Sequence, residues 1–320
     1  MRDVSTSQIR VRVPSKINLF LGVQGVRDDG YHELVTVLQT VSIHDTITLE
    51  LAGAGVSVHP SARRFMRVEL EVDGVGGVPD DDSNLILRAA RSLMDVLGVG
   101  GDQDASGAPN AVTRLHLTKR IPVAAGMAGG SADAAATLVA LNHLWGSGLT
   151  REALRDLAED LGADVPFCLT GGTALGTGTG ARTVQVLTRG IGYWVVGISS
   201  EPLSTPDVFK RFDDVGVLTG YEPDVVLAAV RAGDVDALGA SLWNDLEVAT
   251  FNLMPGLRQK RDAMLKAGAL GAIVSGSGPT IVALAPDARA AVRIAEQVEG
   301  VFDRVEVAFG PAGGPELSAT

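Results

Sequence analysis

Short runs of alternating apolar and polar residues dominate the first part of the chain. Residues 9–13 read I-R-V-R-V, and residues 34–41 and 45–51 alternate well enough to predict two further strands. Residues 14–22 form another short apolar run, which we interpret as a separate strand. Residues 24–34 contain Asp-Asp-Gly, a turn signal. The pattern therefore predicts several short strands before the first helix.

Helices enter the pattern from residue 82 onward. Asp-Ser-Asn at 82–84 predicts the start of a helix over 85–97, and Thr150 predicts the start of another that ends near 161. The remaining apolar patterns predict helices at 204–212, 223–232, 255–267 and 288–299, and strands at 68–72, 113–117, 182–187, 193–198, 271–274, 280–284 and 304–308.

This order of elements favours an α+β fold. Strands come first and then mix with helices without regular β-α alternation, which argues against a doubly wound sheet. We expect a domain boundary near Gly190, which gives domains 1–189 and 190–320. Residues 52–82 and 98–110 read as insertions, the second one flexible, and the residues from about 310 onward as a disordered tail.

Composition narrows the possible partners and the compartment. A chain of 320 residues, 46% hydrophobic, is long enough for two domains that share a core. Its net charge of −11 argues against nucleic acid or an anionic membrane as the main partner. The single cysteine, Cys168, excludes an internal disulfide, and no apolar run is long enough to span a bilayer. We therefore expect a cytoplasmic protein.

The stretch at 121–137, IPVAAGMAGGSADAAAT, is the strongest candidate for chemistry. A glycine-rich turn precedes an alanine-rich segment that favours helix from Ser131 onward. Free N–H groups at a helix start attract anions, so the stretch is typical of a loop that binds a nucleotide phosphate. A tight strand-to-helix connection is the alternative, because neither G-x-x-x-x-G-K-[ST] nor a dinucleotide G-x-G-x-x-G is present.

Three segments resemble the motifs of the GHMP kinases. The glycine loop resembles motif 2, P-x-x-x-G-L-G-S-S-A-A, with Met127 in place of leucine and Ala128 in place of glycine. Residues 14–21, P-S-K-I-N-L-F-L, resemble motif 1, and residues 275–280, S-G-S-G-P-T, resemble motif 3. Residues 27–34, R-D-D-G-Y-H-E-L, resemble a segment of the branch that phosphorylates a cytidine diphosphate alcohol.

The resemblance implies a two-lobed GHMP kinase fold, with an N-terminal lobe like domain 2 of ribosomal protein S5 and a ferredoxin-like C-terminal lobe. It implies ATP and Mg²⁺ as cofactors. The implied reaction is phosphorylation of the 2-hydroxyl of cytidine diphosphate methylerythritol in the non-mevalonate isoprenoid pathway. We expect only small-molecule partners, with no nucleic acid and no membrane, in a monomer or weak homodimer.

Lys16 and Asp164 are the expected catalytic pair. By local sequence alone, Lys16 reads as a lysine at a sheet edge and Asp164 as a helix cap. However, L-G-A-D-V-P-F matches the family segment whose aspartate is the general base. Phosphoryl transfer depends mainly on positioning and charge stabilisation, so a lysine beside this carboxylate keeps it ionised and can touch the acceptor oxygen or γ-phosphate. Contact between the two residues is therefore a prediction.

The same resemblance assigns the substrate contacts. Tyr31 and Phe209 would stack on the two faces of the cytosine ring, and His32 would read the polar edge of the base. Asn18 and Thr205 are further expected contacts. The alternatives are a Tyr-His pair with half-buried rings in a hairpin loop, and a phenylalanine that simply packs its helix.

The expected ATP-binding residues lie in and around the glycine loop: Asn84 near the adenine, Lys119, Pro122, Ala124, Gly126, Met127, Ala128, Gly129, Gly130, Ser131 and Ala132. Lys119 could instead end its strand in solvent, as could Arg120. The hydroxyl of Ser131 either caps the helix or ligates Mg²⁺, and no second carboxylate ligand is evident. Motif 3 would support the loop through close backbone approach at Gly276, Ser277 and Gly278.

Three other functions stay open at this point. The first is another GHMP kinase, such as a homoserine or mevalonate kinase. The D-G-Y-H segment and Phe209 argue against it, because the acceptors of those kinases have no base on which an aromatic side chain could stack. A non-catalytic GHMP-fold regulator would be expected to lose Lys16 or Asp164, and both are present. A nucleotide-dependent dehydrogenase is disfavoured by the order of the elements.

Overall fold

Two β-sheets, each with its own helices, make up the computed structural model, which describes residues 7–52, 66–74, 76–79, 81–99 and 111–319. The first sheet has the order β12-β1-β2-β4-β3, with β5 and β6 joined through β2 and β8 paired to β1. Its strands are β1 (Ser7–Val26), β2 (His32–Ala52), β3 (Met66–Gly74), β4 (Ala111–Lys119), β5 (Thr173–Gly178), β6 (Arg182–Gln185), β8 (Trp243–Asn244) and β12 (Glu316–Ala319).

The second sheet has the order β11-β7-β10-β9 and is antiparallel throughout. Its strands are β7 (Gly192–Ile198), β9 (Gly271–Val274), β10 (Ile281–Ala285) and β11 (Arg304–Gly310). The helices are α1 (Leu85–Leu97), α2 (Gly129–Leu144), α3 (Arg151–Leu161), α4 (Val165–Thr170), α5 (Thr205–Val215), α6 (Asp224–Ala232), α7 (Val235–Ser241), α8 (Glu247–Leu253), α9 (Gly256–Lys266) and α10 (Ala288–Val298). The predicted α+β class is confirmed.

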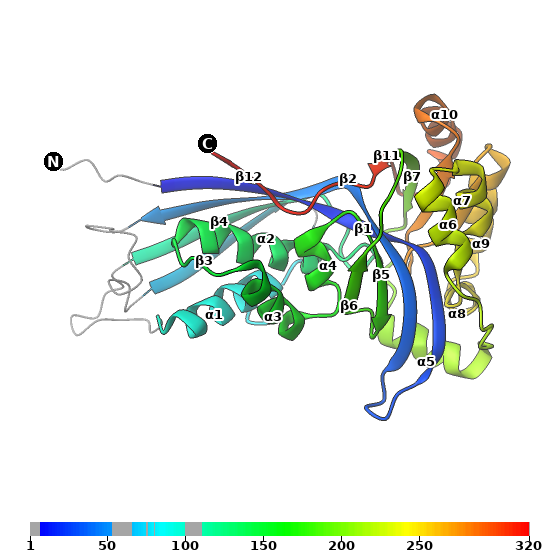
Figure 1. Ribbon diagram of the computed structural model, residues 1–320. Coiled ribbons are helices and arrows are strands. Elements are labelled where there is room, and N and C mark those ends of the chain that lie inside the picture. Colours follow the sequence, from blue (N-terminus) through cyan, green and yellow to red (C-terminus); the bar gives the residue numbers. More distant parts are fainter. Residues whose placement is uncertain (1–6, 53–65, 75, 80, 100–110, 320) are drawn as a thin grey trace.

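The first two strands are much longer than the alternation predicted. β1 and β2 are each continuous, whereas the sequence suggested two short strands in each, so that prediction was wrong. The pairing shifts at Pro14–Ser15, where Pro14 faces His44 and Ser15 faces Val41. A β-bulge therefore lies where the pattern breaks, and it accommodates a proline that cannot donate to the ladder. Figure 1 shows both strands running on to the hairpin beside α5.

Each long strand has different neighbours at its two ends. β2 pairs with β4 through Thr46–Ala52 and with β5 through Leu34–Gln39. β1 pairs with β12 near its start and with β8 at Phe20 and Leu21. The expectation of a disordered tail from about 310 is wrong, because β12 completes this edge of the sheet and Ala312 donates a backbone hydrogen bond to Thr40.

Helix α2 is the centre of the first lobe. Most of its residues are buried, and alanine is the commonest among them, so the helix packs closely against the strands and against its helical neighbours. Figure 1 shows α1 to α4 on one side of the first sheet and α6 to α10 gathered around the second. The predicted caps are confirmed: the side chains of Asn84 and Thr150 accept from the first turns of α1 and α3.

Several short elements were not predicted from the sequence, namely α4, α7, α8, β5, β8 and β12.

Of the two expected insertions, the first contains β3, which pairs in parallel with β4 and confirms the strand expected at 68–72. Residues 53–65 and 100–110 lie outside the described residues. A domain boundary at Gly190 stays a prediction, since β8 and β12, which follow it in the chain, both pair with β1.

Candidate active site

A cavity of about 660 Å³ is lined by segments from both lobes. Its walls come from the middle of β1, the start of α1, the loop before α2, the start of α4 and the start of α5. Of the residues expected from the sequence, it gathers Lys16, Asn84, Lys119, Pro122, Ala124, Gly126, Ala128, Gly129, Gly130, Ser131, Asp164, Thr205, Phe209, Gly276 and Ser277. This set includes both expected catalytic residues.

The contact between the two expected catalytic residues is confirmed. Lys16 Nζ lies 3.6 Å from Asp164 Oδ2, with 6% of the lysine side chain and 33% of the aspartate side chain exposed. Asp164 occupies the N-cap position of α4, but its side chain makes no capping hydrogen bond and is left to face Lys16. Lys16 also donates to Asn18 Oδ1 at 2.9 Å, and Asn18 donates to Thr36 Oγ1. Asn18 therefore fixes the position of the Lys16 ammonium group, and Lys16 lines the cavity.

The glycine loop has the backbone shape of an anion cradle. Ala128 is the N-cap of α2 and adopts a left-handed φ of 53°, without a side-chain cap to the helix. Ser131 is thus the third helical residue and does not cap, contrary to one of our two alternatives. Because no side chain caps the first turn, its N–H groups are left for an anion.

Motif 3 supports this loop, as expected. Ser275 Oγ donates to the carbonyl oxygen of Gly126 at 3.0 Å. A Cβ atom built on Gly126 would lie 2.0 Å from the Ser275 carbonyl oxygen, and the φ of Gly126 is +74°. Glycine is therefore required there by both space and conformation. The backbone N–H of Lys16 donates to the Met127 carbonyl, which ties β1 to the same loop.

Lys119 is buried between two carboxylates, which excludes the interpretation that it ends its strand in solvent. Its Nζ lies 2.5 Å from Asp45 Oδ2 and 2.6 Å from Asp133 Oδ2. Asp45 also accepts from the backbone N–H groups of Arg120 and Ile121, so it fixes the chain where it enters the loop. A Cβ atom on Gly129 would meet Lys119 Nζ at 2.8 Å. The ammonium thus lies directly against the first residue of α2.

Asp133 is the unusual member of this network. Burial, together with the nearby charge of Asp45, raises the pKa of Asp133 to about 8 despite the opposing effect of Lys119. Its second oxygen, Oδ1, has no hydrogen-bond partner within the part of the chain that the structure describes. The raised pKa and the deep burial favour a protonated, neutral carboxyl at Asp133.

We expect Asp133→Asn to change how stability depends on pH. Between the ordinary aspartate range and pH 8 the folded state holds one more proton than the unfolded chain, so the free energy of unfolding falls as pH rises. Asparagine resembles the protonated acid and does not titrate. The variant should match the wild type near pH 5 and be more stable near pH 8, as measured by urea unfolding without nucleotide. A parallel pH slope in both proteins would contradict this.

Of the residues expected to hold the cytosine, Phe209 lines the cavity, whereas Tyr31 and His32 lie outside its lining. Tyr31 is at the hairpin tip with 67% of its surface exposed. The imidazole of His32 stacks on Phe209, with ring centroids 4.7 Å apart, and its Nε2 lies 2.7 Å from Asp213 Oδ1. In this structure His32, rather than Tyr31, therefore covers a face of Phe209. The hydroxyl of Thr205 is 2.8 Å from Ser277 Oγ, which joins α5 to motif 3.

Six expected residues do not line the cavity, as far as the described residues show: Asn18, Tyr31, His32, Met127, Ala132 and Gly278. Asn18, Met127 and Ala132 are buried behind its wall. The backbone N–H of Gly278 donates to the Ser275 carbonyl and so closes the motif 3 turn. These residues shape the wall, and direct ligand contacts of their side chains stay predictions.

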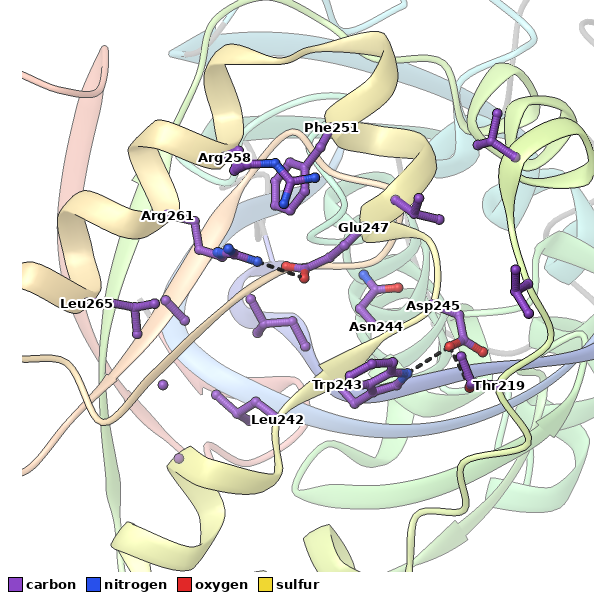
Figure 2. A pocket seen from close by; sticks show the side chains of 17 residues that line it. Thr219, Leu242, Trp243, Asn244, Asp245, Glu247, Phe251, Arg258, Arg261 and Leu265 are labelled. Atoms are coloured by element: carbon purple, nitrogen blue, oxygen red, sulfur yellow. Dashed lines mark hydrogen bonds and ion pairs between the residues drawn. The ribbon is translucent and has the colours of Figure 1, made fainter.

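A second cavity, of about 610 Å³, lies behind motif 3 (Figure 2). Its polar side chains are engaged in structural contacts: Asp245 accepts from Trp243 and Thr219, and Glu247 pairs with Arg261. Asn244 donates to the carbonyl groups of Val274 and Gly276. This region therefore supports the motif 3 loop from its far side.

Sequence reasoning missed four of these acidic and amide residues. Asp45 and Asp133 hold Lys119, Asp213 holds His32, and Asn244 holds motif 3. Only Asp133 could have been noticed in the sequence, because a charged residue within an alanine-rich apolar helix indicates a buried polar contact. The other three lie in segments with no motif, and only the tertiary structure brings them to their partners.

Family models match both lobes. Residues 84–172 match the model described as GHMP kinases N terminal domain, and residues 226–304 match the one described as GHMP kinases C terminal. A curated protein of Salinispora tropica named 4-diphosphocytidyl-2-C-methyl-D-erythritol kinase is 45% identical, over 98% of this chain and 95% of its own length. One of the same name from Corynebacterium efficiens is 44% identical, over 96% of this chain and 95% of its own.

Solved structures agree with the family models. A crystal structure of 4-(cytidine 5'-diphospho)-2C-methyl-D-erythritol kinase matches with a TM-score of 0.73 at 32% identity, over 95% of this chain and 100% of the other. The structure of a homoserine kinase from Cytophaga hutchinsonii matches with a TM-score of 0.72 at 21% identity, over 98% of each chain. The two TM-scores are nearly equal, so the fold alone does not distinguish a cytidine diphosphate methylerythritol kinase from a homoserine kinase. The sequence identity is higher to the former.

The described residues contain neither a metal-binding cluster of acidic, histidine or cysteine side chains nor a membrane-spanning helix. Among them, no cluster of three or more His, Cys, Asp or Glu side chains is arranged to hold a metal ion. No helix in the same part of the chain is both long and apolar enough to cross a membrane.

Proposed function

This chain belongs to the 4-diphosphocytidyl-2-C-methyl-D-erythritol kinases, a group within the GHMP kinases, and we propose that it transfers the γ-phosphate of ATP to the 2-hydroxyl of 4-diphosphocytidyl-2-C-methyl-D-erythritol. This is a step in the non-mevalonate route to isoprenoid precursors. The observation that carries the proposal is the approach of Lys16 and Asp164 beside the glycine loop in one cavity.

The two catalytic residues have separate tasks. Asp164 accepts the proton of the acceptor hydroxyl and orients that hydroxyl toward the phosphate. Lys16, held by Asn18, stabilises negative charge on the transferring phosphoryl group and on the acceptor oxygen. In a loose transition state the protein contributes mainly position and charge, and a buried ammonium on a rigid strand provides both.

ATP and Mg²⁺ fit the residues around the loop. The N-terminal N–H groups of α2 lie at the cavity wall and suit a phosphate, and Asn84 at the start of α1 lines the same cavity, where adenine is expected. Mg²⁺ usually takes one or two protein oxygens and otherwise phosphate and water, so the absence of a three-residue acidic cluster in the described residues is compatible with it. The Ser131 hydroxyl would hold the ion, which would neutralise phosphate charge.

The far end of the cavity supports selection of a base-bearing acceptor. Phe209 lines it, the imidazole of His32 stacks on that aromatic ring, and Asp213 contacts the same imidazole. An acceptor such as homoserine or mevalonate has no ring to stack there. We therefore assign the cytidine group to this end and the ATP phosphates to the loop before α2.

The test is ADP release, measured in a coupled assay with four acceptors: the cytidyl diphosphate alcohol, mevalonate, homoserine and galactose. We expect release with the cytidyl compound alone. Release with another acceptor would keep the kinase activity and discard the cytidine site. Tight ATP binding with no release from any acceptor would favour a non-catalytic regulator.

A further inference from the structure

Helix α5 contacts one histidine with two side chains that lie one turn apart. Phe209 and Asp213 are at positions i and i+4, so they share one face of the helix. Phe209 contacts the face of the His32 ring, and Asp213 contacts its Nε2 atom at 2.7 Å. The imidazole side chain is 10% exposed, whereas that of Asp213 is 50% exposed. The ring is thus fixed in both its plane and its rotation.

We propose that Asp213 is a positioning residue that sets the base selectivity of the kinase through the tautomer of His32. This proposal rests on the proposed function, in which the Phe209 end of the cavity, beside His32, receives the base. A carboxylate only accepts hydrogen bonds, so Nε2 of His32 carries the proton that points to Asp213. In the neutral ring Nδ1 is then unprotonated and is an acceptor.

An acceptor at this position distinguishes the two pyrimidines. Cytosine carries an amino group at C4, which donates to Nδ1, whereas uracil carries a carbonyl oxygen there, which is repelled by the same lone pair. Without Asp213 the ring is free to adopt the other tautomer, in which Nδ1 carries the proton. That N–H group can donate to the carbonyl oxygen of uracil, so the site no longer excludes uracil. A site built to hydrogen-bond one partner rejects the other because polar groups are left unpaired.

The structure offers a closely matched control. Asp214 is the next residue on α5, and it pairs with Arg211 one turn earlier instead of with His32. Asp213→Asn and Asp214→Asn therefore remove the same charge from the same helix, and only the first changes the partner of the imidazole. Asparagine at 213 keeps the size of the side chain, and its amide can donate or accept, so it no longer selects one tautomer.

The kinetic experiment compares the cytidine substrate with its uridine counterpart in the full-length enzyme. For Asp213→Asn we expect KM for the cytidine substrate to rise about tenfold, and the cytidine-over-uridine ratio of kcat/KM to fall about tenfold, with kcat and the KM for ATP unchanged. Asp214→Asn should behave as the wild type. In a His32→Ala background, Asp213→Asn should change neither quantity further, because the effect passes through the imidazole.

A second measurement does not depend on the substrate. The ¹⁵N chemical shifts of the histidine side chains separate protonated from unprotonated ring nitrogens, and His32→Gln assigns the signal among the five histidines. We expect the Nε2–H form of His32 in the wild type and in Asp214→Asn, and a mixture of tautomers in Asp213→Asn.

The outcomes are distinct. The proposal would be overturned if Asp213→Asn and Asp214→Asn gave the same KM and the same cytidine-over-uridine ratio of kcat/KM. It would also be overturned if Asp213→Asn changed these two quantities as much in the His32→Ala background as in the wild type. An Nδ1–H form in the wild type would overturn it as well. If the wild type does not phosphorylate the cytidine substrate at all, the proposed function fails and selectivity between bases fails with it, while the tautomer result still reports whether Asp213 controls His32.

Discussion

Asp164→Asn should lower kcat by about 10³-fold, within the range that a positioned general base contributes. The amide keeps the shape of the side chain but cannot accept the hydroxyl proton. Lys16 loses its 3.6 Å ionic partner and keeps the hydrogen bond to Asn18, so the strand around it stays in place. ATP affinity, measured by titration calorimetry, should change by no more than about twofold.

The matched control is Asp160→Asn. Asp160 is an exposed aspartate near the end of α3, just before the segment that carries Asp164. It should retain wild-type turnover and affinity. If Asp164→Asn also turned over at a rate near that of the wild type, Asp164 would not be the base. If it lost ATP affinity and turnover together, its role would be to hold the site in shape.

Lys119→Met should lower the free energy of unfolding by about 3–5 kcal/mol, because it leaves the buried carboxylate of Asp45 without its cation. The side chains of Asp45 and Asp133 are 0% and 4% exposed, so water does not replace the ammonium. Since a domain is typically stable by only about 5–15 kcal/mol, the loss should be plain in urea unfolding. Lys266→Met, on the exposed side of α9, should change stability by no more than about 0.5 kcal/mol.

A second substitution separates charge from packing in this prediction. Adding Asp45→Asn to Lys119→Met removes the negative charge left behind and keeps an oxygen that can accept from the backbone N–H groups of Arg120 and Ile121, so the double variant should recover part of the lost stability. If the loss came only from the shape of the methionine, the second change would not restore anything. A loss below about 1 kcal/mol for Lys119→Met alone would show that the network is not electrostatically coupled.

The sequence predicted those parts of the molecule whose signals are local. The caps at Asn84 and Thr150, the alanine-rich helix and the glycine loop are each determined by neighbouring residues, and each was found. The approach of Lys16 to Asp164 was also predicted, but from the resemblance to a family and not from the pattern of residues. Without motifs 1 and 2, a lysine at a sheet edge and a helix cap were the better interpretations.

The parts that were missed depend on tertiary contacts. The breaks at Pro14 and near Ser42 are genuine breaks in alternation, yet the chain continues through them as a β-bulge because both strands find partners on either side. The residues from 316 onward have no strong strand pattern, and they form β12 because β1 offers an unpaired edge. The pairing of Lys119 with Asp45 joins the neighbouring strands β4 and β2 and leaves no trace in the sequence around either residue.

The pairing of β12 with β1 has a consequence for synthesis on the ribosome. Residues 9–12 of β1 pair with residues 316–319 of β12, so the outer edge of β1 stays open until β12 has been translated. An open edge can recruit a strand from another nascent chain. Arg10 and Arg12 are exposed along this edge, and two positive charges on an unfinished edge repel an identical one. We therefore expect the two arginines to disfavour pairing between emerging chains until β12 has been made.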